Sequence, residues 1–127
     1  CYYDVNHRLV ISKIKEGKVI ATNVLSRANN IWDSHNNIIS TIHNGRIYVT
    51  GNVHNDKLKV FVLSVNNFRL EKTIENEELT SITYPRFIKD DNELKIIFRN
   101  GKSGNGAFYF SSLESDNMSN LKKLFNN

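Results

Sequence analysis

The chain has 127 residues, of which 39% are hydrophobic and 24% are charged. This balance is too apolar and too mixed in charge for a disordered chain, and the length suits one hydrophobic core. No run approaches the roughly 18 to 20 consecutive apolar residues of a membrane-spanning helix, so we expect no membrane insertion. The net charge of +4 favours an acidic partner, although the basic residues are scattered and ordinary solubility charge explains the value more simply.

Short strands joined by tight turns are predicted along the whole chain, and no stretch shows a convincing helical period. Two strands at 9–14 and 18–25 are joined by a turn at Glu16 and Gly17. Strands at 37–42 and 46–50 flank Asn44 and Gly45, the strongest two-residue hairpin signal in the sequence. Strands at 58–65 and 68–74 follow. After an acidic linker at 75–78, the same order returns with strands at 82–88, 93–98, 107–113 and 120–125.

The second and third sets of strands repeat with a period of about 48 residues, close to the 40 to 50 residues of a β-propeller blade. Each unit is predicted to be a four-stranded meander. Its third strand, at 58–63 or 107–110, is apolar on both faces, as expected for a strand sandwiched between neighbouring blades. The predicted fold class is therefore all-β, a β-propeller fragment of about two and a half four-stranded blades.

The predicted boundaries are the end of one blade at 1–31, a second blade at 32–78 and a third at 79–127. A propeller closes with about four to eight blades, and the chain opens with Cys1 where a complete sequence has Met. We therefore expect the remaining blades to lie in a longer parent chain. A complete small β-sandwich or barrel built from the same strands is the competing interpretation.

Four side chains are candidates for a site because of their places in the repeat. His35 and Tyr84 precede the first strand of their blades, while His54 and Arg99 follow the second strand. Because these two strands form an antiparallel hairpin, all four residues are predicted to lie on one rim. His43, beside the Asn44-Gly45 turn, is expected on the opposite rim, about 25 Å away at the usual rise of a strand.

Structural explanations for the same residues stay open, because a His at a strand end, a Tyr before Pro and an Arg on a rim also occur without function. Other chemistries have weaker support. The glycine-rich stretch at 100–106 lacks the first glycine of a phosphate loop, since position 96 is Ile96. Asp33 has no partner carboxylate for glycosidase chemistry, and the histidines lack compact zinc-ligand spacing. We expect no metal and no cofactor.

Several linked motifs resemble the BNR-repeat proteins and, within that group, the ulvan lyases of polysaccharide lyase families 24 and 25. The match runs along nearly the whole chain. It differs from the family pattern at Val53, which replaces a methionine, at Asn100, which replaces an aspartate, and at Lys102, which replaces a glycine. The similar segments are Tyr2-Tyr-Asp-Val-Asn-His-Arg-Leu9, Trp32-Asp-Ser-His-Asn36, Gly51-Asn-Val-His54, Thr83-Tyr-Pro-Arg-Phe87, Phe98-Arg-Asn-Gly101 and Ser103-Gly-Asn-Gly106.

The resemblance implies a seven-bladed, secreted or cell-envelope propeller that cleaves a uronate-containing acidic polysaccharide by β-elimination and does not bind nucleic acid. Two residues would be catalytic, with His35 suited as the base and Tyr84 as the acid, or Tyr84 serving both steps. The residues expected to bind substrate are His54, Arg99, Asn36 and Asn105. A non-catalytic glycan-binding propeller and a structural or protein-interaction propeller are the alternative functions.

Overall fold

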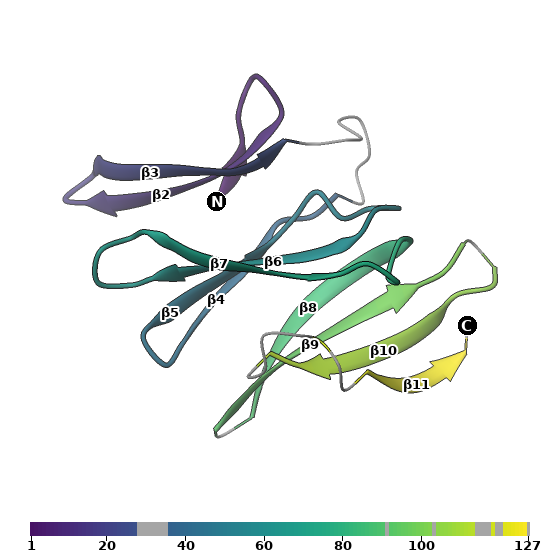
Figure 1. Ribbon diagram of the computed structural model, residues 1–127. Helices are drawn as coiled ribbons and strands as arrows, with labels where there is room; N and C mark the ends of the chain where they lie inside the picture. Colours follow the sequence, from purple (N-terminus) through teal and green to yellow (C-terminus); the bar gives the residue numbers. More distant parts are fainter. Residues whose placement is uncertain (28–35, 91, 103, 114–117, 119–120, 127) are drawn as a thin grey trace.

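A computed structural model describes residues 1–27, 36–90, 92–102, 104–113, 118 and 121–126 (Figure 1). Every regular element among them is a β-strand, which confirms the all-β prediction. No helix in these ranges is long and apolar enough to cross a membrane. The strands are β1 (Tyr2–Tyr3), β2 (Arg8–Lys15), β3 (Lys18–Arg27), β4 (Ile39–His43), β5 (Arg46–Thr50), β6 (Leu58–Ser64), β7 (Leu70–Asn76), β8 (Ile82–Asp90), β9 (Glu93–Asn100), β10 (Ala107–Ser112) and β11 (Lys122–Asn126).

The strands form three antiparallel sheets that follow one another along the chain. β1, β2 and β3 make a three-stranded sheet, and two four-stranded sheets follow, β4-β5-β6-β7 and β8-β9-β10-β11. Each sheet is a meander in which consecutive strands pair. Figure 1 shows the three sheets stacked in chain order, as blades are. The predicted strands are confirmed with shifts of at most two residues at their ends, and the two-residue β1 is an addition to the prediction.

Tight turns close the hairpins where the sequence predicted them. Glu16 and Gly17 have φ values of 51° and 75°, and Asn44 and Gly45 have 46° and 72°. Two consecutive positive φ values are typical of the two-residue turn whose twist matches paired strands. Gly17 and Gly45 adopt this conformation without the steric cost that a side chain adds.

The third strand of the second sheet forms the centre of the core, because both of its faces are covered. Leu58, Val60 and Val62 pack with residues of the third sheet, including Phe98. The alternate side chains Phe61 and Leu63 pack with residues of the first sheet, including Leu9. Each fully buried aliphatic side chain stabilises the fold by about 1.5 to 3 kcal/mol. Packing through this strand therefore fixes the three sheets against one another.

Two local predictions were wrong. Arg99 does not follow the second strand of its sheet but is the seventh residue of β9, because the pairing of β9 with β8 and β10 continues to Asn100. Tyr84 does not precede the first strand of its sheet but lies inside β8, at its third residue. The strand continues through Pro85 because β8 is an edge strand, where the missing N–H of proline removes no hydrogen bond of the sheet.

Candidate functional site

The ends of several strands meet at one rim of the stacked sheets. Ile82, the first residue of β8, pairs with Asn100, the last residue of β9, and Asn100 also pairs with Ala107 at the start of β10. The β5–β6 connection reaches the same place. His54 forms an isolated bridge with Ile82, and the Asn55 N–H donates to the Ile82 carbonyl at 3.0 Å. We call this edge the upper rim.

Three candidate residues are brought together on the upper rim by this pairing. His54 bridges to Ile82, Tyr84 follows two residues later on β8, and Arg99 pairs across the sheet with Thr83. The order across the rim is thus the β5–β6 connection, β8 and β9. His54, Tyr84 and Arg99 come from two neighbouring sheets, as the repeat spacing predicted.

A β-bulge determines how Tyr84 is presented. Thr83 pairs with Arg99, but the next pair joins Arg86 to Ile97, so β8 has one residue more than β9 in this stretch. Tyr84 has a φ of 54°, which non-glycine residues rarely adopt and which costs about 1 to 3 kcal/mol. Its side chain is 43% exposed. Bulges of this kind redirect a side chain and are common beside active sites.

Arg99 is buried, with only 7% of its surface exposed. Its Nη1 donates to the Gly101 carbonyl at 2.7 Å, and its Nη2 donates to the Lys102 carbonyl at 2.7 Å. Neither acceptor carries a full charge, and no carboxylate of the described residues forms an ion pair with Arg99. A buried guanidinium with no carboxylate partner among the described residues keeps a positive charge that an anionic group can neutralise.

The β9–β10 connection is shaped around this guanidinium. A Cβ at Gly106 would lie 2.3 Å from Arg99 Cζ and 2.5 Å from its Nε, so a side chain at this position would force the guanidinium to move. Gly101 has a φ of 121°, and the Asn105 N–H donates to the Lys102 carbonyl at 3.1 Å, which closes the loop. Asn105 is exposed on this loop, on the same rim as Arg99.

The β5–β6 connection holds the second part of the candidate site. Asn52 is buried with a φ of 56°, and its side-chain Oδ1 accepts a hydrogen bond from Asn36 Nδ2 at 3.3 Å. Asn36 is half-buried, and so is His54. Asn36, predicted to bind substrate, therefore lies beside the segment that contains His54.

His35, the predicted base, lies outside the described residues, as does the segment 28–35 to which it belongs. His43 lies at the other end of the sheet, where it pairs with Arg46 at the β4–β5 hairpin. A pocket of about 190 Å³ opens there, lined by His43, Asn44, Arg46, Tyr48, Lys72, Leu94 and Leu113. Arg46 is paired with Glu71 at 2.9 Å. We call this edge the lower rim.

Several residues of the upper rim were missed by the sequence analysis. Thr83 is buried, and its hydroxyl has no hydrogen-bond partner among the described residues, although it lies directly across from Arg99. Gly106 and Asn52 were missed as well. The glycines at 100–106 indicate a backbone that another group can approach closely. The structure shows that this group is the Arg99 guanidinium, which the sequence did not reveal.

The described residues contain no cluster of three or more His, Cys, Asp or Glu side chains that could hold a metal ion.

Lys57 forms an ion pair with Glu77, which raises the pKa of the Lys57 ammonium above its usual value. This pair joins the β5–β6 connection to the β7–β8 connection on the exposed surface. Arg99, His54 and Tyr84 are the side chains of the described upper rim that are best suited to bind a charged substrate or transfer a proton.

The stacked antiparallel meanders, with polar residues gathered where consecutive strands end, define a repeat protein of the β-propeller type. The chain belongs to the BNR repeat-containing family, whose family model matches residues 1–127. Searches of the curated proteins and of the solved structures find no match to this chain.

Proposed function

We propose that the upper rim binds a uronate-containing acidic polysaccharide and cleaves it by β-elimination, as a polysaccharide lyase of the ulvan-lyase kind. One observation above all supports this function. A strained bulge presents the Tyr84 phenol at the surface, one strand away from the buried Arg99, which no carboxylate among the described residues neutralises. The net charge of +4 is compatible with an acidic glycan.

The reaction needs three groups. The proton at sugar carbon 5 is taken by a base, the bond from carbon 4 to the glycosidic oxygen breaks, and a double bond forms between carbons 4 and 5. The leaving oxygen receives a proton from an acid. The uronate carboxylate beside carbon 5 must be neutralised, because negative charge develops next to it in the transition state.

Arg99 supplies the neutralising charge in this proposal, and His54 and the amides of Asn36 and Asn105 bind the sugar. His35 is assigned as the base by the family resemblance, and Tyr84 protonates the leaving oxygen. The bulge supports the assignment of Tyr84, because backbone strain of this kind persists only where the surrounding structure enforces it. From the family resemblance we also propose that the protein is secreted or lies in the cell envelope.

A glycan-binding propeller without catalysis is the second candidate. The exposed or half-buried amides of Asn36 and Asn105 lie on the same rim as Arg99, and amides with a guanidinium are sufficient to bind an acidic sugar without proton transfer. This function predicts saturable binding and no new product.

The test is the ultraviolet absorbance of unsaturated uronate ends when the full-length protein is incubated with ulvan and other uronate polysaccharides. We expect Tyr84→Phe to lower the rate by about 100-fold or more while polysaccharide binding and thermal stability are kept. Tyr48→Phe, which removes a hydroxyl at the lower rim, is the matched control and should retain the wild-type rate. If the wild type binds the polysaccharide but the absorbance does not rise, the non-catalytic function is established instead. If the wild type shows neither binding nor turnover, the protein-interaction propeller is the function that stays.

A further inference from the structure

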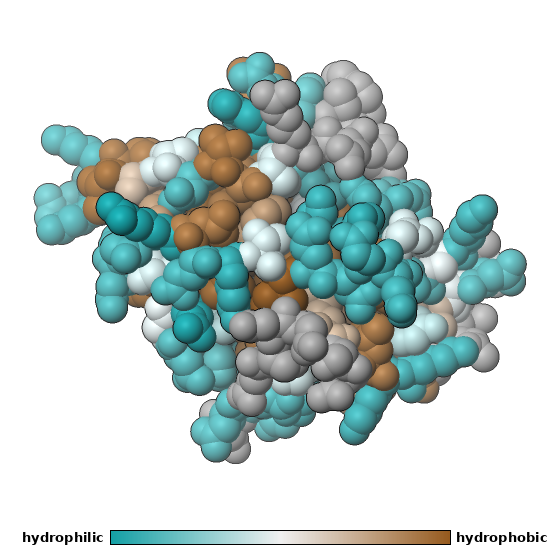
Figure 2. All heavy atoms as spheres, in the orientation of Figure 1, coloured by the Kyte–Doolittle hydropathy of each residue, from teal (hydrophilic) through white to brown (hydrophobic). Residues whose placement is uncertain are grey.

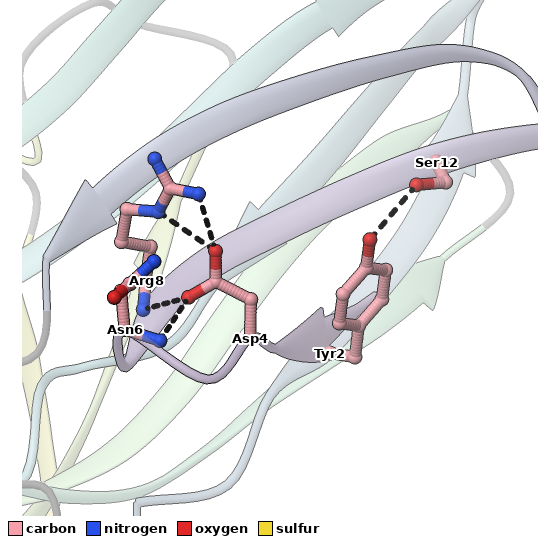
Figure 3. A network of polar contacts seen from close by, with 5 residues as sticks. All are labelled: Tyr2, Asp4, Asn6, Arg8 and Ser12. Carbon is pink, nitrogen blue, oxygen red and sulfur yellow. Dashed lines mark hydrogen bonds and ion pairs between the residues drawn. The ribbon is translucent and has the colours of Figure 1, made fainter.

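The turn between β1 and β2 is fixed by one carboxylate (Figure 3). Asp4 Oδ1 accepts hydrogen bonds from the backbone N–H groups of Asn6 at 3.0 Å and Arg8 at 2.9 Å. Asp4 Oδ2 accepts from Arg8 Nε at 2.7 Å and lies 2.6 Å from Arg8 Nη2. Hydrogen bonds from Arg8 hold the pKa of the Asp4 carboxyl below its usual value. The turn sets the register in which Tyr3 pairs with Leu9.

This register directs the Tyr3 ring toward the second sheet, because Tyr3 packs with the same core cluster as Leu9. The Tyr3 hydroxyl accepts a hydrogen bond from the Asn52 backbone N–H at 2.9 Å. Burial raises the pKa of Tyr3, so the phenol is neutral at physiological pH. A Cβ at Gly51 would lie 3.0 Å from the Tyr3 hydroxyl and 3.2 Å from Leu9 Cδ2, so the two sheets approach closely here.

Asn52 is held from three directions. Its backbone N–H bonds to Tyr3 of β1, its Nδ2 donates to Ser26 Oγ of β3 at 3.0 Å, and its Oδ1 accepts from Asn36 Nδ2 at 3.3 Å. These contacts come from two strands of the first sheet and from the segment before β4. They stabilise the positive φ of Asn52, which is otherwise unfavourable for a residue with a side chain.

Only Val53 separates Asn52 from His54, and Val53 is buried in the core between the second and third sheets. The chain entering His54 is thus fixed by the first sheet at Asn52 and by the core at Val53. The bridge to Ile82 fixes the other side. The backbone of His54 is therefore held on both sides, and its half-buried side chain starts from a fixed place on the upper rim.

We propose that Tyr3 and Asn52 are positioning residues through which the first sheet sets the place of His54 in the substrate site of its neighbours. The proposal rests on the proposed function for the identity of the substrate, but the placement of His54 itself does not. Removing the Tyr3 hydroxyl frees the Asn52 N–H in a partly buried place, which allows the Asn52–His54 segment to shift.

The test compares Tyr3→Phe with Tyr2→Phe in the full-length protein. Tyr2 is the matched control, since it is adjacent on β1 and its hydroxyl lies 3.5 Å from Ser12 Oγ (Figure 3). The Asn52 N–H donates to Tyr3 and not to Tyr2. Isotope labelling of histidine allows the imidazole resonances of His54 to be followed by NMR. We expect Tyr3→Phe to shift them and Tyr2→Phe to leave them unchanged.

In the absorbance assay, Tyr3→Phe should raise KM for the polysaccharide about five- to tenfold, with a smaller change in kcat. Unchanged His54 resonances in a folded Tyr3→Phe protein would overturn the positioning proposal, because a purely structural role lowers only the stability. If Tyr3→Phe does not fold, Asn52→Ser, which removes the carboxamide that bonds Ser26 and Asn36, provides the same comparison. An inactive wild type would overturn the proposed function alone, and the NMR comparison would still decide the role of Tyr3.

Discussion

The two rims of the stacked sheets differ in the burial and the partners of their polar groups. At the upper rim, Arg99, Asn52 and Thr83 are buried. Arg99 donates to two backbone carbonyls, and Asn52 bonds to two hydroxyls and an amide, so the partners of both residues are uncharged. Exposed ion pairs occur at both rims, Lys57–Glu77 at the upper rim and the following pairs at the lower rim. Arg46 and Glu71 form an ion pair with side chains 49% and 39% exposed. Lys95 lies 3.2 Å from Asp90 and 3.0 Å from Glu93.

Positive φ values occur at both rims. The lower-rim hairpin at Asn44 and Gly45 is a two-residue turn with the φ values that such turns favour. Non-glycine residues with positive φ lie in connections at both rims, Phe68 with 58° at the lower rim and Asn52 and Asn55 with 56° and 54° at the upper rim. Tyr84, with a φ of 54°, differs from these because it lies inside a strand, β8. Figure 2 shows hydrophilic side chains over much of one face of the molecule, interrupted by hydrophobic groups, so surface polarity alone does not separate the rims. The buried guanidinium of Arg99 and the positive φ of Tyr84 inside β8 distinguish the upper rim, and buried polar groups and backbone strain are typical of functional sites.

The largest expected effect comes from exchanging a cation at each rim. Arg99→Lys removes the planar guanidinium that bonds the Gly101 and Lys102 carbonyls, and an ammonium cannot make the same paired contacts. We expect kcat/KM on a uronate polysaccharide to fall about 100-fold. Arg46→Lys, at the lower rim, should leave kcat/KM unchanged. Equal losses in both variants, measured by steady-state kinetics, would mean that the site is not specific to the upper rim.

Two glycine substitutions give a smaller effect and separate sterics from backbone conformation. Gly106→Ala places a Cβ against the Arg99 guanidinium and should displace it, lowering kcat/KM about tenfold. Gly45→Ala meets no atom within 4 Å but forces alanine to a φ of 72°, which costs about 1 kcal/mol of stability. Chemical denaturation and kinetics together check the pair. A Gly106→Ala protein with wild-type kinetics would show that the place of Arg99 is not important for activity.

The strands were predictable from the sequence because period-two patterns and glycine turns act locally. The Asn44-Gly45 hairpin and the doubly buried β6 both follow from a few neighbouring residues. β1 was not predicted, because two residues are too short for a pattern and Tyr2 and Tyr3 form a strand only by pairing with β2. Local rules also gave no sign of the bulge at Tyr84, which depends on the register between β8 and β9.

The rim positions of His54, Tyr84 and Arg99 could be predicted from repeat spacing, since antiparallel pairing determines which strand ends meet. Their environments could not. The burial of Arg99 depends on the missing side chain of Gly106, and the anchoring of Asn52 depends on Tyr3, 49 residues away in the sequence. Contacts between sheets of this kind have no local signature. The catalytic roles remain predictions for the experiments proposed here.

The smallest expected effect concerns two carboxylates, one near each rim. Hydrogen bonds lower the pKa of Asp4, chiefly from Arg8, and of Glu93, chiefly from Ser112 and then Lys95. A carboxyl with a lowered pKa in the folded state adds stability above its unfolded pKa, and this contribution is lost as the pH falls through the folded value. Asp4→Asn and Glu93→Gln should therefore both weaken the loss of stability below about pH 4 in urea unfolding.

At neutral pH the two variants should differ in activity. Asp4→Asn loosens the turn that places Tyr3, and through Asn52 the position of His54, so KM should rise by about two- to threefold. Glu93→Gln acts at the far end of β9 and should leave KM unchanged. If the two variants change acid stability alike and neither changes KM, the first sheet contributes packing to the upper rim but does not set the geometry of His54.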